Sequence, residues 1–205
     1  TNSKLDKDIL DILKAYNITL PIIQKNGNTQ ASLLMKFPYD TTKNMSTYGE
    51  FFLNDAKVAI NNFEFESKNA EVILDDSIIK IKNSDFKYKD MINATLNLNL
   101  DIKTLKSYGD ANIKSFLIKE ENKESLVEIK DKNTAIDLNF NNEVSILLKD
   151  LGTNIKISDL IYVNIDDLSK IYPYSKLLKD ISIKDGNISL QIKDEKNMSF
   201  EALVK

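Results

Sequence analysis

The chain contains no cysteine, histidine or tryptophan, and all 28 of its basic residues are lysine, so arginine is absent as well. These absences exclude thiol nucleophiles, histidine general bases, metal sites built from histidine or cysteine, and arginine clamps on phosphate. Aspartate, glutamate, lysine, serine, threonine and tyrosine remain, and an enzyme can be built from them. No motif marks one of the lysines as a catalytic group, however. We therefore expect no enzymatic activity, no metal and no cofactor.

The chain is weakly acidic, with 205 residues and a formal net charge of −3. Proteins that bind nucleic acid usually gather basic side chains on one face. Here lysine and acidic residues alternate instead, as in the segments 6–14 and 119–125. Nucleic acid is therefore not expected as a partner.

Long hydrophobic runs are also missing, since no stretch approaches the about 18–20 apolar residues that span a bilayer. The length fits one domain, and no segment rich in proline, serine or glycine divides it. The chain begins at Thr1 and looks like a piece of a longer protein, so the lack of an export signal or anchor within it carries little weight. Because cysteine is absent, the redox compartment stays open.

Two segments have helical periodicity. The first spans 3–16, with Ser3 as its N-cap, and its apolar positions are Leu5, Ile9, Ile12, Leu13 and Tyr16. The second spans 165–180, with Asp166 or Asp167 near its start and a kink at Pro173.

Between these helices, apolar and polar residues alternate with the period of two that is typical of strands. The clearest run is 91–103, in which Ile92 to Ile102 place every second residue on one apolar face. The predicted strands are 31–37, 46–54, 56–62, 63–67, 70–76, 77–83, 84–90, 91–103, 111–118, 125–131, 134–140, 143–150 and 154–158. Asp185 and Gly186 predict a further hairpin turn near the end.

The pattern indicates a mainly β chain of roughly a dozen strands with one or two short helices. No fixed repeat predicts a propeller or solenoid, and an immunoglobulin-type sandwich needs fewer strands. A sheet this wide must curl, split or close. We expect a single module over 1–205 that forms a large curled antiparallel sheet, an open taco-like groove or incomplete barrel.

Two kinds of polar sequence feature are candidate sites: pairs of adjacent aspartates and asparagines in a sequon-like sequence. The acid pairs Asp75–Asp76 and Asp166–Asp167 are interpreted as a strand end and a helix start, because neighbours in a strand point to opposite faces. Asn187 and Asn197 each stand in an acid-x-Asn-x-Ser sequence, which resembles the bacterial sequon for N-glycosylation. Both asparagines are candidate glycosylation sites.

The apolar face of the strands is the main candidate for a binding surface, because few helices are available to cover it. The residues predicted to line this groove are Phe51, Leu53, Val58, Ile60, Phe63, Phe65, Val72, Leu74, Ile79, Ile81, Phe86, Tyr88, Ile92, Leu96, Leu98, Leu100, Ile102, Ile113, Leu117, Ile136, Leu138, Phe140, Ile188, Leu190 and Ile192.

Several strand-forming segments carry a family resemblance. They are a strand started by Gly49, "AKVAI" at 56–60, "AEVILDD" at 70–76, "IKIKNSDFKY" at 79–88, "LNLNLDIKTLKSYGDANI" at 96–113 and "DGNISLQI" at 185–192. In pattern and strand order the chain from about residue 17 onward resembles AsmA-like proteins, the group that includes YhdP and TamB.

The resemblance implies a periplasmic β-groove, anchored to the inner membrane by a segment outside this chain. In such proteins the acyl chains of phospholipids are thought to slide along an apolar interior between the inner and outer membranes, in support of outer-membrane integrity. The expected partner is therefore a phospholipid or another lipid with acyl chains, bound without chemistry. The alternative is a structural domain of a periplasmic or surface protein, whose apolar face is a closed core without a ligand.

Overall fold

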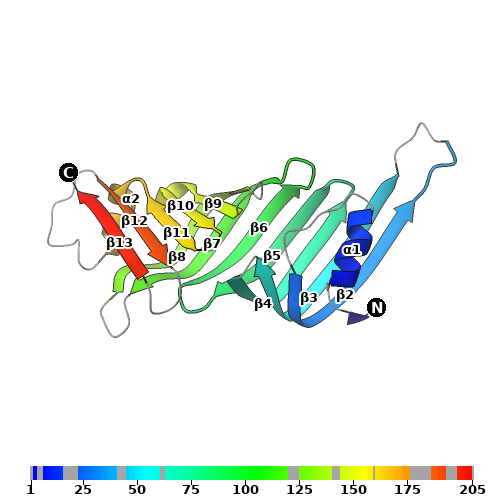
Figure 1. The fold of residues 1–205 in the computed structure, drawn as a ribbon, viewed down its shortest axis with the longest axis horizontal. Helices are drawn as coiled ribbons and strands as arrows, with labels where there is room; N and C mark the ends of the chain where they lie inside the picture. The colour runs from blue at the N-terminus through cyan, green and yellow to red at the C-terminus, as the bar shows by residue number, and fades with distance from the viewer. Residues whose placement is uncertain are drawn as a thin grey trace.

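The computed structural model describes residues 2–3, 7–15, 23–40, 45–60, 63–119, 125–139, 144–158, 160–175, 186–192 and 198–204. Within these residues the chain is mainly β, as predicted, and its strands form one antiparallel sheet that is not closed. Figure 1 shows the sheet running from β2 at one end of the long axis to β13 at the other.

Each of the thirteen described strands pairs only with its neighbours in the sequence, in the order β1 to β13. The long strands are β2 (Ile23–Lys36), β3 (Ser46–Ile60), β4 (Phe63–Asp75), β5 (Ile78–Tyr88), β6 (Ile92–Asp101), β7 (Lys106–Lys119) and β8 (Ser125–Asn139). The short ones are β1 (Asn2–Ser3), β9 (Val144–Leu148), β10 (Thr153–Ile157), β11 (Ile161–Ile165), β12 (Gly186–Ile192) and β13 (Met198–Val204). The described helical segments are α1 (Lys7–Ala15), η1 (Lys149–Leu151), α2 (Leu168–Ile171) and η2 (Tyr172–Tyr174).

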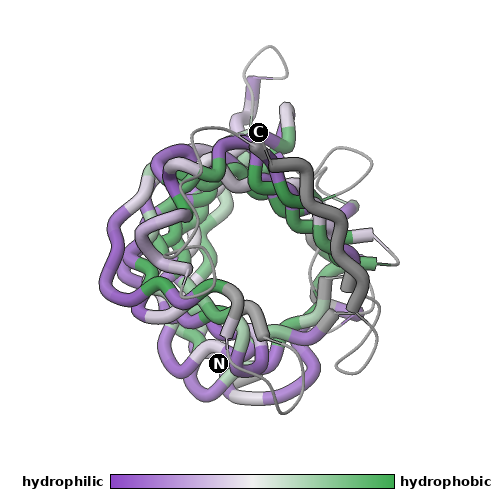
Figure 2. Tube along the Cα trace, turned by 90° about the vertical axis from the view of Figure 1, so that its left-hand side faces the viewer, coloured by the Kyte–Doolittle hydropathy of each residue, from purple (hydrophilic) through white to green (hydrophobic). Residues whose placement is uncertain are grey.

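The alternation of apolar and polar residues decides how the sheet curls. In β6, Ala94, Leu98 and Leu100 are buried and Leu96 on the same face is half-buried. Thr95, Asn97 and Asn99 are half-buried on the opposite face. Because burial of the apolar face removes it from water, the sheet bends around that face. The view along the long axis in Figure 2 shows hydrophobic chain toward the inside of the curl and hydrophilic chain outside. We call these two sides the inner and the outer face.

At four places, two strands predicted from the sequence are one continuous strand in the structure. The predicted pairs 46–54 with 56–62, 63–67 with 70–76, 77–83 with 84–90, and 125–131 with 134–140 are the continuous strands β3, β4, β5 and β8. The polar residues at these joints, which had been interpreted as the ends of strands, lie in local irregularities of the strands. Pairing with the neighbouring strands continues on both sides of them.

At these joints, the residues whose side chains point inward switch from odd-numbered to even-numbered positions. In β5, Ile79 is buried before Asn83, and Tyr88 is buried after it. Asn83 has a φ of 42°, and the pairing of β5 with β6 shifts by one residue there. Asp55 in β3 and Asp131 in β8 have φ values of 46° and 50° at the equivalent points. Asparagine and aspartate tolerate this left-handed conformation better than most residues, and such bulges bend a strand.

The bulges lie beside one another across the sheet. Gly27 in β2 lies against Asp55 in β3, so closely that a Cβ on Gly27 would be 2.5 Å from the Asp55 carbonyl oxygen. The Asn97 side chain accepts a hydrogen bond of 2.8 Å from the Asn83 backbone N–H. Asn112 donates to Asn133 across β7 and β8 at 2.6 Å. Close contacts therefore connect the irregular positions of β2, β3 and β5 to the neighbouring strands.

The first helix is shorter than predicted. Ser3 is not its N-cap, because Ser3 belongs to β1 and pairs with Thr29 of β2, and α1 begins at Lys7. Ile12, one of the apolar positions of the predicted helix, is 53% exposed, whereas Leu10, which was not among those positions, packs against the sheet. The start of the helix and the side chain that it buries depend on contacts with the edge and the inner face of the sheet. A helical period in the sequence does not reveal these contacts. Leu5 and Tyr16 lie outside the described residues.

The second helical segment also differs from the predicted 165–180. Residue 165 ends β11, α2 spans only Leu168–Ile171, and the turn η2 containing Pro173 follows directly. Asp167 is the N-cap, as its predicted place near the helix start implies, and accepts a hydrogen bond of 3.0 Å from the Ser169 N–H. Residues 176–180 lie outside the described part of the chain. The predicted hairpin turn at Gly186 is also wrong in part, since Gly186 begins β12 and pairs with Val204.

Candidate functional site: the apolar inner face

The buried side chains form two clusters on the inner face. The smaller cluster is Leu74, Ile79 and Leu100, and α1 contributes Leu10 to it. The larger one extends from Phe65 in β4 to Leu190 in β12. Ile81 packs against both clusters, so the inner face is one continuous apolar surface.

The larger cluster is closed at one end by the short helical segments. Leu151 of η1 and Leu168 and Ile171 of α2 are completely buried in it. Contacts of α2 with β12 and of η2 with β8 place these segments across the curl. At this end, the interior is therefore filled by side chains.

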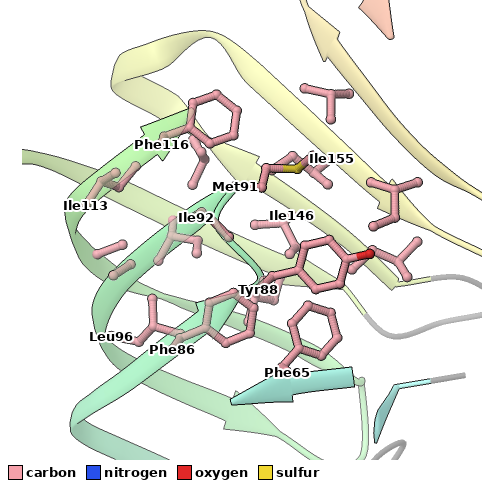
Figure 3. A pocket seen from close by; sticks show the side chains of 18 of the residues that line it. Phe65, Phe86, Tyr88, Met91, Ile92, Leu96, Ile113, Phe116, Ile146 and Ile155 are labelled. Carbon is pink, nitrogen blue, oxygen red and sulfur yellow. The ribbon is translucent and has the colours of Figure 1, made fainter. Parts of the chain in front are cut away.

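A cavity of about 100 Å³ remains inside the larger cluster. Figure 3 shows aromatic and aliphatic side chains that converge on it from facing strands, including Phe65, Phe86, Tyr88, Phe116 and Ile155. Among the described residues, no charged side chain lines it. Phe65 stacks on Phe86 with ring centroids 4.9 Å apart and lies 5.2 Å from the Tyr88 ring, which gives one wall an aromatic surface. Such a cavity favours an apolar occupant, because a charged or strongly polar group would lose its hydration without gaining a partner.

Most of the predicted groove residues face this interior. Those that line the cavity are Phe65, Phe86, Tyr88, Ile92, Leu96, Ile113, Ile136 and Leu138. Those that belong to or pack against the two clusters elsewhere are Phe51, Val58, Val72, Leu74, Ile79, Ile81, Leu98, Leu100, Ile102, Ile188 and Leu190. Leu53 is buried outside both. Phe140 lies outside the described residues, and the side chains of Ile60, Phe63 and Ile192 are not described.

Leu117 is the exception. It pairs with Glu128, which lies between the buried Val127 and Ile129 on β8, and the two partners share the outer face. The cause is the irregularity in β7 between Ile113 and Phe116, both of which are buried. A one-residue shift moves every following side chain to the other face, so an uninterrupted alternation assigns Leu117 wrongly.

Sequence reasoning missed more than half of the cavity wall. The residues that it did not name are Met91, Ala94, Ala111, Phe116, Val144, Ile146, Leu148, Ile155, Ile157, Ile161 and Val163. The strong alternation in 144–148 and 153–165 is a signal that could have found most of them. Phe116 was missed because of the parity change in β7. Ala94 lay on the predicted apolar face of 91–103 but was not named as a groove residue.

Charged groups gather on the outer face. Ion pairs join Lys80 to Asp75 at 2.9 Å, Lys114 to Asp85 at 2.9 Å, and Lys149 of η1 to Asp137 of β8 at 2.8 Å. These side chains are 30–51% exposed to solvent, so each pair contributes little to stability. The described residues contain no group of three or more acidic side chains arranged to hold a metal ion.

The predicted acid pairs have structural roles. Asp75 ends β4, and Asp76 follows in the turn, where its carboxylate accepts a hydrogen bond of 2.8 Å from the Thr47 N–H. Hydrogen bonds from Ser169 lower the pKa of the Asp167 carboxyl, as expected of a carboxylate that caps a helix. Of the two candidate glycosylation sites, Asn187 is exposed in β12, and Asn197 lies outside the described residues.

None of the helices in the described part of the chain combines the length and apolar character needed to cross a bilayer. The geometry is that of an apolar interior inside a curled, charged shell. Comparison of the chain with family models, with curated proteins and with solved structures gives no match.

Proposed function

We propose that the chain binds the acyl part of a lipid, preferably a phospholipid, inside the curled sheet and lets it move along the inner face without chemistry. The observation that carries this proposal is the continuous apolar inner face around a cavity whose described lining residues are all uncharged. Acyl chains need such a surface, because their transfer out of water is favourable by about 0.8 kcal/mol for each buried methylene.

The size of the cavity indicates how a chain is accommodated. Its volume of about 100 Å³ takes a short apolar group, since a cavity of about 150 Å³ admits benzene. A whole acyl chain therefore requires the interior to widen. The sheet is not closed, and Phe51, Val72 and Leu96 on its inner face are only half-buried, which leaves room to separate the walls.

The absence of charged groups from the cavity supports a role in binding rather than catalysis. In the described residues, carboxylates and lysines form ion pairs on the outer face, where water solvates them. The proposed setting, the periplasm between the inner and outer membranes, rests on the family resemblance and is part of the same proposal.

A structural domain with a closed core is the second candidate, and the packing of the wall favours it. Ile113, Phe116 and Ile136 are 0%, 1% and 4% exposed, which is typical of an ordinary core. In that case, the cavity would be a packing defect and no lipid would be held.

Mass spectrometry of organic extracts from the purified protein separates the two candidates. The proposal expects phospholipid at a constant molar ratio, and the structural alternative expects clean extracts. Leu96→Asp places a carboxylate in the half-buried cavity wall, so it should greatly reduce lipid recovery while circular dichroism stays unchanged. The matched control is Asn93→Asp on the outer face of the same strand, where Lys87 lies opposite. A folded Leu96→Asp protein with undiminished lipid would contradict the proposal.

A further inference from the structure

The hairpin of β2 and β3 exposes apolar side chains on both of its faces and in its loop. These side chains are Leu33, Leu34, Phe37, Tyr39, Tyr48 and Phe52. Phe37 and Tyr39, on either side of Pro38, are the most exposed, at 63% and 108%. Six exposed apolar side chains on one hairpin are more than scattered single surface residues, and such a concentration usually marks an interaction site.

This hairpin also extends beyond its neighbours. Its strands stay paired to Lys36 and Ser46, whereas the pairing of β3 with β4 stops at Tyr48 and Asp75. The turn after β4 is fixed at Thr47, to which Asp76 donates a backbone hydrogen bond of 2.7 Å. The loop that carries Phe37 and Tyr39 therefore lies past the β4–β5 turn, at the far upper right of Figure 1.

We propose that the tip of this hairpin docks onto the surface of a lipid bilayer. A stable protein interface needs about 800 Å² from each partner, usually on one complementary face. The hairpin is narrow and apolar on both faces, so a protein partner would have to surround it, whereas a bilayer surrounds an inserted tip on all sides. Phenylalanine and tyrosine are suited to the boundary between head groups and acyl chains, where one end of the ring is apolar and the other wet.

The polar groups of the hairpin limit how deeply its tip can insert into the bilayer. Beyond the two residues that pair with β1, no described strand covers the outer edge of β2, and unpaired backbone groups do not enter the hydrocarbon core. Lys36 is exposed beside Phe37 and can reach lipid phosphate. The Tyr48 hydroxyl donates a hydrogen bond of 2.7 Å to Glu50, and this bond raises the pKa of Tyr48, so the phenol stays neutral.

The docked tip would connect to the interior of the sheet. Leu33 pairs with Gly49 and Phe51 with Ala31, which places Leu33 on the same inner face as Phe51. Phe51 packs against the cluster of Leu74, Ile79 and Leu100. An acyl chain that leaves the bilayer at the tip would thus meet apolar surface as far as the cavity. This last step rests on the proposed function, but the docking itself does not.

Because the chain has no tryptophan, a single introduced tryptophan reports on its own position. Tyr39→Trp should shift its fluorescence to shorter wavelength when phosphatidylcholine vesicles are added. Bromine near the head-group end of the acyl chains should quench it more than bromine near the chain ends. Tyr108→Trp is the control, since Tyr108 is an exposed aromatic residue on another strand, β7, and should show neither effect.

Co-sedimentation with the same vesicles gives an independent readout. Phe37→Ser should lower the bound fraction roughly five-fold, because a largely exposed aromatic ring is lost from the contact, and Tyr108→Ser should leave it unchanged. Absence of vesicle binding by the unaltered chain, or equal binding by Phe37→Ser, would overturn the docking proposal. Lipid recovered in extracts tests the cavity separately, so failure of one proposal is distinguishable from failure of the other.

Discussion

The Asn97 side-chain amide of β6 donates a hydrogen bond of 3.1 Å to the Asp110 carboxylate of β7, and the same side chain accepts from the Asn83 backbone of β5. One asparagine thus joins three adjacent strands beside a bulge. This position explains why a polar residue on the outer face matters for the shape of the sheet.

Asn97→Asp should destabilise the fold by about 1 kcal/mol at neutral pH, because two carboxylates then face each other across the strands. Protonation of the carboxylates at low pH removes the repulsion, so the loss of stability should shrink as the pH falls below about 4. Urea denaturation at pH 7 and pH 3 measures both effects. The exchange Asn97→Asp with Asp110→Asn restores an amide–carboxylate pair and should recover most of the loss. Equal instability of the single and double variants would argue against this pairing.

Gly109 lies where two strands approach closely, and a Cβ there would be 1.9 Å from the Asn97 carbonyl oxygen. Gly109→Ala should therefore force β6 and β7 apart and cost about 3 kcal/mol or more. At Gly49, an added Cβ would meet the Phe51 side chain at 2.8 Å, and a side chain can rotate away. Gly49→Ala should accordingly lower the melting temperature less than Gly109→Ala does.

Asn83 tests the bulges as bending elements, since its φ is 42°. Asn83→Val places a β-branched residue in a left-handed conformation and should cost about 1–2 kcal/mol. Asn83→Gly should be tolerated within about 0.5 kcal/mol, because glycine adopts this conformation without strain. Equal unfolding midpoints for the two variants would show that the bulge carries no backbone strain.

Leu98 is 3% exposed and belongs to the larger cluster without lining its cavity. Leu98→Asp buries a carboxylate without a partner and should cost several kcal/mol, a large part of the about 5–15 kcal/mol that stabilises a typical domain. We expect loss of the cooperative unfolding transition in circular dichroism. Asn99→Asp is the control on the outer face, where Lys80 lies opposite, and should unfold normally.

We expect the stability of the fold to depend on pH through Asp167. Its pKa is lowered in the folded chain, so the charged cap adds stability above about pH 4, and this contribution is lost as the pH falls through the lowered value. Asp167→Asn keeps a good N-cap without the charge. The variant should melt below the unaltered chain at pH 7, and the two melting temperatures should converge toward pH 2. A constant difference across this range would contradict the role of the charge.

The sequence by itself determined the fold class and most of the inner face. Alternation in 91–103 assigned Ile92, Leu96, Leu98 and Leu100 to one side, because the pleat of a strand permits no other arrangement. It also located the joints at Asp55 and Asn83, although it took them for the ends of strands. A bulge and a turn use the same residues, so only the pairing of the neighbouring strands distinguishes them.

The tertiary structure decided the rest. Which apolar residues surround the cavity depends on how far the sheet curls, and the curl is the sum of twists and bulges over many strands. For the same reason, Leu117 lies on the outer face and Phe116 on the inner one, although both belong to one apolar run. The exposure of Phe37 and Tyr39 follows from the length of β2 and β3 relative to β4, a property of three strands together. Periodicity describes one strand at a time, whereas the groove and its projecting tip arise from many.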